Sequence, residues 1–169
     1  MPVDSFKYVA RILAAYYRMA DMHLELPIPW TPLKTPLSES TFSLVTTGGL
    51  YDRGVEHPFD LEREKREPDW GDPSYRTLPT DIAQDQVGAS HYHLNTSDVL
   101  EDMNILLPVH RFRELTERGR IGGVAEEVYS VMGYQGFPPE TTVWRTQTGP
   151  ELAARMLAHG VDCVFMTPA

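Results

Sequence analysis

The chain has 169 residues and a mass of 19.2 kDa, with 41% hydrophobic and 10% aromatic residues, which predicts one folded domain with a real core rather than a disordered chain. Its formal net charge of −9 disfavours nucleic acid as a partner, because phosphate binding needs concentrated Lys and Arg. The apolar runs fall far short of the roughly 20 residues of a membrane span, and no secretory signal is recognised, so we expect a cytoplasmic protein with no membrane contact.

The N-terminal segment 1–26 is predicted to form a helix. Apolar residues recur every three or four positions from Phe6 to Met22, as in an amphipathic helix. Its apolar face packs either on the domain itself or against a partner chain. Prolines in the segment 27–40 then predict an extended connector, and 41–169 is predicted to be the folded α/β domain.

The domain begins with a predicted strand over Ser40–Thr46. A charge run, Glu62–Glu67, is interpreted as a solvated surface or a short helix without a catalytic role. Further predicted elements, in chain order, are short strands at Tyr75–Leu78 and Val87–Tyr92, a helical turn at Asp98–Met103 with Asp98 as N-cap, a helix at Leu107–Arg118 that Gly119 ends, and an interrupted strand within Val124–Val131.

The end of the chain carries the clearest α/β signature. A helix over Pro150–His159 leads through Gly160 into a buried strand over Val161–Met166. We therefore expect an α/β fold with a mostly parallel, Rossmann-like sheet and flanking helices. The single cysteine, Cys163, excludes an internal disulfide, and its apolar neighbours favour a packed side chain over a nucleophile.

The first strand runs into Thr47-Gly48-Gly49, a loop that predicts substrate contact. Its backbone amides could face an anion or a carboxylate, because glycine permits close approach. The competing interpretation is a structural turn. The spacing is not that of a dinucleotide-binding or P-loop motif, so no nucleotide is predicted.

The densest polar cluster contains the candidate catalytic residues His91, His93 and Asp98. On a strand, the two histidines would share one face, and Asp98 could orient an imidazole in a cleft beside the glycine turn. One histidine hydrogen-bonded inside the fold is the alternative, and a divalent-metal site is a further one, although no metal is predicted. Arg76 could bind a substrate carboxylate or pair with Asp72 or Asp81 within the fold.

Short stretches in a fixed order over most of Trp30–Pro168 also resemble a known family, the selenoprotein B subunits of glycine, sarcosine, betaine and D-proline reductases. Each stretch is unspecific alone, and the ordered set carries the resemblance. The stretches are Leu44–Leu50, His57–Asp60, Gly71–Arg76, His91–His93, Asp102–Ile105, Arg111–Leu115, Ile121-Gly122 and Tyr129–Gly133.

The resemblance implies a component of a selenol- or thiol-dependent reductase that acts on a small amine or amino acid. In that family, the strand corresponding to Val161–Met166 is followed by a selenocysteine, or sometimes a cysteine, that serves as the nucleophile. A pyruvoyl group in a partner subunit holds the amine, and thiols or thioredoxin restore the site. The implied assembly is a homo-oligomer or a heteromer with a pyruvoyl-type subunit.

The sequence ends at Ala169, where the family's selenocysteine would follow, so no cofactor is expected within the chain and we expect the chain alone to be inactive. A UGA codon read as a stop is favoured over a natural half-length subunit. Two other classes stay open. They are a non-catalytic partner subunit of a heteromeric complex and a metal-dependent hydrolase or isomerase with His91, His93 and Asp98 as ligands.

Overall fold

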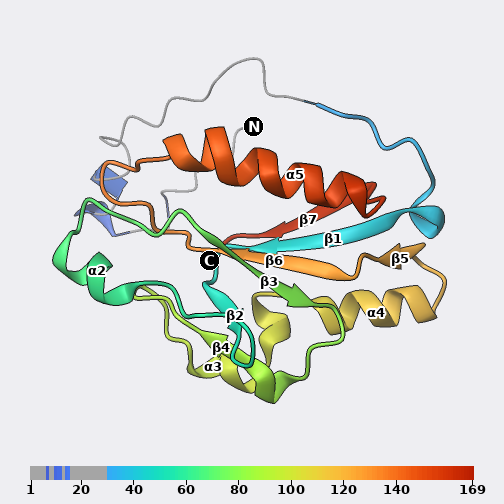
Figure 1. The fold of residues 1–169 in the computed structure, drawn as a ribbon, viewed down its shortest axis with the longest axis horizontal. Coiled ribbons are helices and arrows are strands. Elements are labelled where there is room, and N and C mark those ends of the chain that lie inside the picture. The colour runs from blue at the N-terminus through green and yellow to red at the C-terminus, as the bar shows by residue number, and fades with distance from the viewer. Residues whose placement is uncertain (1–6, 8–9, 13, 16–29) are drawn as a thin grey trace. The chain divides into compact units, whose positions relative to one another are not determined.

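The computed structural model describes residues 7, 10–12, 14–15 and 30–169 (Figure 1). The chain divides into two compact units, Met1–Pro32 and Leu33–Ala169. Of the predicted helix Phe6–Met22, residues 11–12 and 14–15 are helical, and most of the remainder lies outside the described residues. Residues 30–36 form neither helix nor strand, as Pro32 and Pro36 predict. A 3-10 turn, η2 (Leu37–Glu39), leads into the domain.

The second unit is built on a mixed, mostly parallel sheet with β1 (Thr41–Thr46) at its centre. Along one edge of β1, β5 (Gly123–Val124) and then β6 (Glu127–Val131) pair with it in parallel, and β7 (Cys163–Thr167) pairs in parallel along the other edge. The fifth strand, β3 (Tyr75–Pro79), is antiparallel to β6. The predicted α/β class is confirmed, and the antiparallel β3 makes the sheet mixed.

Side chains of successive strand residues alternate between the two faces of this sheet. Leu44 and Val128 belong to one buried cluster, which also contains residues of α4 (Val109–Glu117). Val45 and Tyr129, their neighbours in sequence, pack instead with Leu152 and Met156 of α5 (Gly149–Ala158). Helices therefore cover both faces, with α5 on one side and α4 on the other (Figure 1).

The predicted boundaries of the flanking helices hold closely. Pro108 is the N-cap of α4, and Gly119 follows the helix with a φ of 62°, a left-handed conformation that glycine adopts without steric cost. A π-helical turn, η5 (Trp144–Thr148), precedes α5. The interruption predicted within Val124–Val131 is real, because residues 125–126 separate β5 from β6.

A second, two-stranded antiparallel sheet pairs β2 (Leu50–Asp52) with β4 (Val87–Ala89). Around it lie two short helices and two 3-10 turns: α2 (Leu61–Arg66), η3 (Gln84–Gln86), α3 (Ser97–Glu101) and η4 (Met103–Ile105). The predicted strand Val87–Tyr92 thus ends three residues early. The N-cap of α3 is Thr96, so Asp98 lies in the first turn of the helix rather than at its cap. No helix among the described residues has the length and apolar character needed to cross a membrane.

Candidate functional site

The parallel strands β1, β6 and β7 end at one edge of the sheet, and the predicted glycine turn lies there. The amide of Thr47 donates to the carbonyl of Thr167 at 3.1 Å, and the amide of Gly49 donates to the carbonyl of Val131 at 3.2 Å. Gly48 donates to the hydroxyl of Thr46 at 3.1 Å. All three amides have partners within the fold, so in this conformation the turn holds strand ends together, as the structural interpretation predicted.

Gly49 brings this turn against the loop that carries the histidines. Its φ is 65°, and a Cβ there would lie 2.2 Å from the carbonyl oxygen of Ser90. Only glycine allows this approach. Ser90 donates its amide to the carbonyl of Gly49 at 2.9 Å and its hydroxyl to the carbonyl of Phe59 at 3.1 Å. His91 therefore follows a residue fixed to the glycine turn.

The predicted strand face for His91 and His93 is wrong, because β4 ends at Ala89 and both histidines lie in a turn. The turn forms because the amide of His93 donates to Nδ1 of His91 at 3.2 Å. The two rings are nevertheless close, with centroids 6.2 Å apart in a T-shaped arrangement. His91 is buried, whereas the side chain of His93 is 48% exposed.

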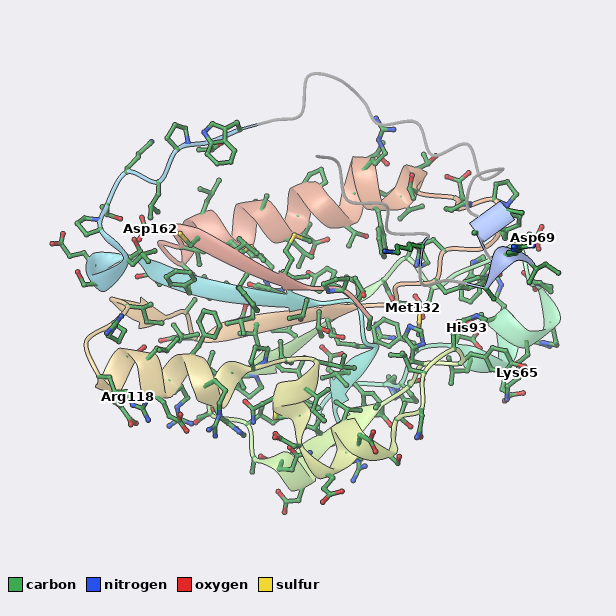
Figure 2. The ribbon with its side chains drawn as sticks, turned by 180° about the vertical axis from the view of Figure 1, so that it is seen from behind. Lys65, Asp69, His93, Arg118, Met132 and Asp162 are labelled. Atoms are coloured by element: carbon green, nitrogen blue, oxygen red, sulfur yellow. The ribbon has the colours of Figure 1, made fainter. Side chains whose placement is uncertain are left out.

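The carboxylate beside His93 comes from Glu64 of α2, not from Asp98. Nε2 of His93 lies 3.3 Å from Oε1 of Glu64, whose side chain is only 2% exposed. The ring of Tyr134 packs on the imidazole of His93 with a centroid distance of 4.6 Å. Figure 2 shows His93 and Lys65 of α2 on one side of the view and Asp162 on the other.

Sequence reasoning missed Glu64 because it was hidden in the charge run Glu62–Glu67, to which no role was given. One signal was available. Glu64 lies three positions after Leu61, so the two share a helix face, and that face turns inward. Asp98, by contrast, is exposed, and its carboxylate accepts a hydrogen bond from the hydroxyl of Ser97.

Burial sets the electrostatics of this cluster. Burial raises the pKa of Glu64, and the charge of Asp72 adds to the rise, while His93 opposes it. Burial, with a smaller contribution from the charge of His93, lowers the pKa of His91. Oε1 of Glu64 and Nε2 of His91 are both buried without a hydrogen-bond partner within the described residues. Such atoms are costly, and they mark candidate sites of function.

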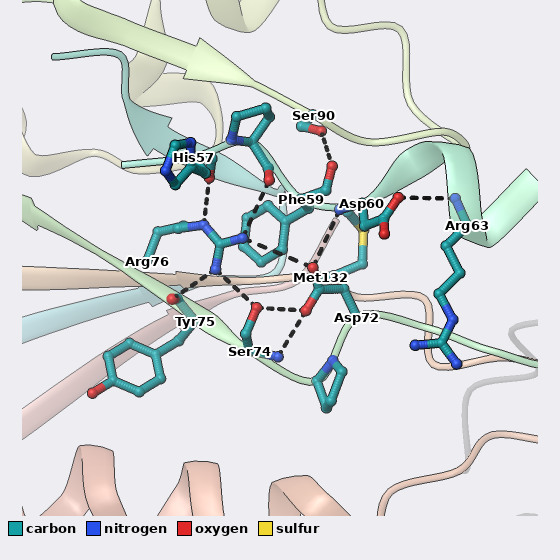
Figure 3. Close-up of polar contacts among 12 residues, drawn as sticks. His57, Phe59, Asp60, Arg63, Asp72, Ser74, Tyr75, Arg76, Ser90 and Met132 are labelled. Carbon is teal, nitrogen blue, oxygen red and sulfur yellow. Dashed lines mark hydrogen bonds and ion pairs between the residues drawn. The ribbon is translucent and has the colours of Figure 1, made fainter. Parts of the chain in front are cut away.

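Arg76 takes the predicted partner within the fold. Its guanidinium lies 3.8 Å from the carboxylate of Asp72, and its Nε donates to the carbonyl of His57 at 2.6 Å (Figure 3). It also packs 4.2 Å over the ring of Phe59. The carboxylate of Asp72 in turn accepts from the amide of Asp60, the N-cap of α2. Arg76 thus anchors the segment that positions Glu64.

The described residues contain no group of three or more His, Cys, Asp or Glu side chains arranged to hold a metal ion. The metal centre of His91, His93 and Asp98, left open by the sequence, therefore has no support in this part of the chain. The chemistry that the cluster offers is that of one buried carboxylate and two imidazoles, which is hydrogen bonding and proton transfer.

Comparison with known proteins decides the family. Residues 15–169 match the glycine/sarcosine/betaine reductase selenoprotein B (GRDB) family. The chain belongs to this family. The sequence resemblance is thereby confirmed, and the ordered stretches on which it was based lie within the matched region. No solved structure matches the chain.

Curated members of the selenoprotein B family are similar over most of this chain. A D-proline reductase subunit gamma of Acetoanaerobium sticklandii is 30% identical over 83% of the chain and 53% of the relative. A glycine reductase complex component B subunit gamma of Carboxydothermus hydrogenoformans is 26% identical over 95% of the chain and 37% of the relative. A betaine reductase complex component B subunit beta of Peptoclostridium acidaminophilum is 28% identical over 87% and 33%, respectively. The chain spans about half or less of the length of these relatives.

Proposed function

We propose that the chain is a component of a selenol- or thiol-dependent reductase that acts on a small amine or amino acid. The match to the selenoprotein B family over residues 15–169 carries this proposal. The relatives are named for D-proline, glycine and betaine reductases. These three compounds share a nitrogen bonded to the carbon that bears a carboxylate, so the proposed reaction is reductive cleavage of that carbon–nitrogen bond.

The cluster of Glu64, His91 and His93 is the part of the chain that we assign to this chemistry. It adjoins the carboxyl edge of the parallel strands, where ligands bind in α/β sheets. Cleavage of a carbon–nitrogen bond leaves an amine that must gain a proton. The imidazole of His93 is half exposed and lies 3.3 Å from the carboxylate of Glu64, a position from which it could donate that proton.

Cys163 does not fit the nucleophile that the reaction needs. Burial raises the pKa of its thiol, and the charge of Asp162 raises it further, whereas a reactive cysteine needs a lowered pKa. The residue is also held within β7, paired with Phe42 of β1. We therefore propose that the selenol or thiol nucleophile, and the pyruvoyl group that supplies an electrophilic carbonyl, reside outside the residues of this chain.

A subunit of such a complex needs a contact surface, and the outer edge of β7 supports one. Val164, Phe165 and Met166 are 45%, 40% and 66% exposed. Within the described residues, β7 pairs with β1 alone. An apolar edge strand is a template for pairing with another chain, so we propose that a second polypeptide of the complex covers it, as a heteromer or a homo-oligomer.

The test is to isolate the chain from its source cells under native conditions and compare the recovered complex with the chain alone. With a dithiol reductant, the complex is expected to consume D-proline, glycine or betaine with matching oxidation of the dithiol. The chain alone is expected to be inactive and to sediment as a smaller particle. A native complex inactive toward all three compounds, beside an active D-proline reductase from Acetoanaerobium sticklandii, would contradict the proposal, as would turnover by the chain alone.

A further inference from the structure

The two histidines of the turn after β4 need opposite protonation states. The amide of His93 donates to Nδ1 of His91 at 3.2 Å, so this nitrogen carries a lone pair and the buried ring of His91 is neutral. The ring of His93 instead faces a carboxylate, because its Nε2 lies 3.3 Å from Oε1 of Glu64. A buried carboxylate needs a cation close by. The contacts of the turn are therefore satisfied when one imidazole is neutral and the other is charged.

Glu64 depends on His93 for its counter-charge. The side chain of Glu64 is 2% exposed and that of His93 is 48% exposed, so the imidazole covers the carboxylate from solvent. Within the described residues, Oε1 of Glu64 has no hydrogen-bond partner. The charge of Asp72 acts on Glu64 in the unfavourable sense, because it raises the pKa of Glu64. Lys65, on the same helix, pairs instead with Glu62 at 3.0 Å.

The turn is fixed at its first residue and held more loosely beyond it. Ser90 bonds through its amide to the carbonyl of Gly49 at 2.9 Å and through its hydroxyl to the carbonyl of Phe59 at 3.1 Å. The half-exposed ring of His93 packs on the ring of Tyr134 with a centroid distance of 4.6 Å. A change in the charge of His93 can therefore move its ring without displacing Ser90 from the fold.

Each histidine sets one limit of pH on this arrangement. A protonated His91 has no lone pair on Nδ1, so it cannot accept from the amide of His93. The two rings are 6.2 Å apart, so two cations would also repel each other. Burial and the charge of His93 lower the pKa of His91, which moves this limit toward acid. The other limit is the loss of the proton from His93, which leaves Glu64 buried without a cation.

We propose that residues 91–93 form a pH-sensitive cover over Glu64, which is closed while His91 is neutral and His93 is protonated. As the pH rises, His93 loses its proton, and its ring turns to solvent and admits water to Glu64. As the pH falls, His91 gains a proton, and the turn loses its internal hydrogen bond. The cover is closed only between these two titrations. It goes beyond the proposed function, because it operates whatever reaction the complex catalyses.

The first measurement follows the contact between the rings of His93 and Tyr134 by NMR, in the full chain labelled on its histidine and tyrosine rings. The nuclear Overhauser effect between these rings is expected to pass through a maximum between about pH 4.5 and pH 9 and to fall about 2-fold or more toward each end. The effect between Tyr75 and Tyr129, whose centroids are 6.2 Å apart, is the reference. Burial raises the pKa of both reference tyrosines, so neither ionises in this range.

The nitrogen shifts of the same histidine rings report their protonation and identify the group behind each fall in the His93–Tyr134 signal. The fall toward acid is expected to share its midpoint with the protonation of His91, and the fall toward alkali with the deprotonation of His93. A constant signal would overturn the proposal, and so would midpoints that match neither histidine. A parallel loss of the reference signal would overturn it as well, because the whole unit would then unfold.

Two variants test the contacts one at a time, with His159→Gln, at an exposed position, as the control that retains both falls. Glu64→Gln is expected to abolish the fall toward alkali, because the buried amide needs no cation. His91→Asn keeps an acceptor near the position of Nδ1 and does not titrate, so it is expected to abolish the fall toward acid. An alkaline fall that persists in Glu64→Gln, or an acid fall that persists in His91→Asn, would contradict the cover.

Discussion

Two glutamates, Glu127 on β6 and Glu64 on α2, show how differently this chain uses a carboxylate. Both oxygens of Glu127 on β6 accept hydrogen bonds from Arg155 of α5 at 2.8 Å, and one also accepts from the hydroxyl of Tyr129 at 3.0 Å. Glu64 on α2 is more deeply buried and has one oxygen without a hydrogen bond. The carboxylate of Glu127 joins a helix to the sheet, whereas the carboxylate of Glu64 lies beside the half-exposed imidazole of His93.

The pKa values follow the same division. Burial acts to raise the pKa of Glu127, but the hydrogen bonds from Arg155 and Tyr129 outweigh it, and the pKa is lowered. The hydroxyl of Tyr129 donates to Glu127, and burial together with this hydrogen bond raises the pKa of Tyr129 to about 12. Burial raises the pKa of Glu64 instead. Folding therefore stabilises the charge on Glu127 and opposes the charge on Glu64.

The largest expected effect is that of Arg76, which pairs with Asp72 in the network that positions Glu64. Its side chain is 11% exposed and joins Asp72 to the carbonyls of His57 and Pro58. We expect Arg76→Met to lower the free energy of unfolding by about 3 kcal/mol, because it leaves a buried carboxylate and two carbonyls without their cation.

Urea unfolding at neutral pH measures this loss, with Arg111→Met as the matched control. Arg111 pairs with Glu114 on α4 with 60% of its side chain exposed, and surface pairs contribute about 0–1 kcal/mol. Equal losses for the two variants would show that the Arg76 network contributes no more than a surface pair.

The helices and strands were easier to predict from the sequence than the contacts within the site. Strands β1 and β7 and helices α4 and α5 follow from apolar periodicity and from Gly119 and Gly160, which are local signals. The ordered set of short stretches from Leu44–Leu50 to Tyr129–Gly133 was sufficient to indicate the family. Local patterns thus predicted most of the elements that surround the site.

The partners within the site depend on long-range packing, which local patterns do not encode. His91 and His93 were predicted to share one face of a strand, but the chain turns where Ser90 bonds to the carbonyls of Gly49 and Phe59. Glu64 was assigned to solvent because its neighbours in sequence are charged. It is buried where α2 packs beside His93.

Neutral substitutions of the two glutamates are expected to change stability in opposite directions. Glu127→Gln should lower the free energy of unfolding by about 2 kcal/mol at pH 7, because the charge-assisted bonds to Arg155 are lost. Glu64→Gln should raise it by about 1 kcal/mol, since a neutral amide costs less to bury than a carboxylate and the half-exposed His93 can turn to water. Urea unfolding measures both, and Glu62→Gln, at an exposed pair with Lys65, serves as control. A loss at Glu64 as large as that at Glu127 would remove the distinction between the two carboxylates.

The smallest effect is the pH dependence of these changes in unfolding free energy. The two glutamate variants are expected to show opposite trends with pH. The pKa of Glu64 is raised in the folded state, so its contribution to stability is present below its unfolded pKa and is lost as the pH rises through the folded value. The pKa of Glu127 is lowered, so its contribution is present above the unfolded pKa and is lost as the pH falls through the folded value.

Unfolding measured from pH 3 to pH 8 should therefore show the gain from Glu64→Gln growing with pH, and the loss from Glu127→Gln shrinking toward acid. His93 and Asp72 also face Glu64, so His93→Gln should enlarge the first trend by removing the charge that opposes the rise in the pKa of Glu64. If the unfolding free energies of both glutamate variants ran parallel to that of the unsubstituted chain from pH 3 to pH 8, neither carboxylate would change its pKa on folding.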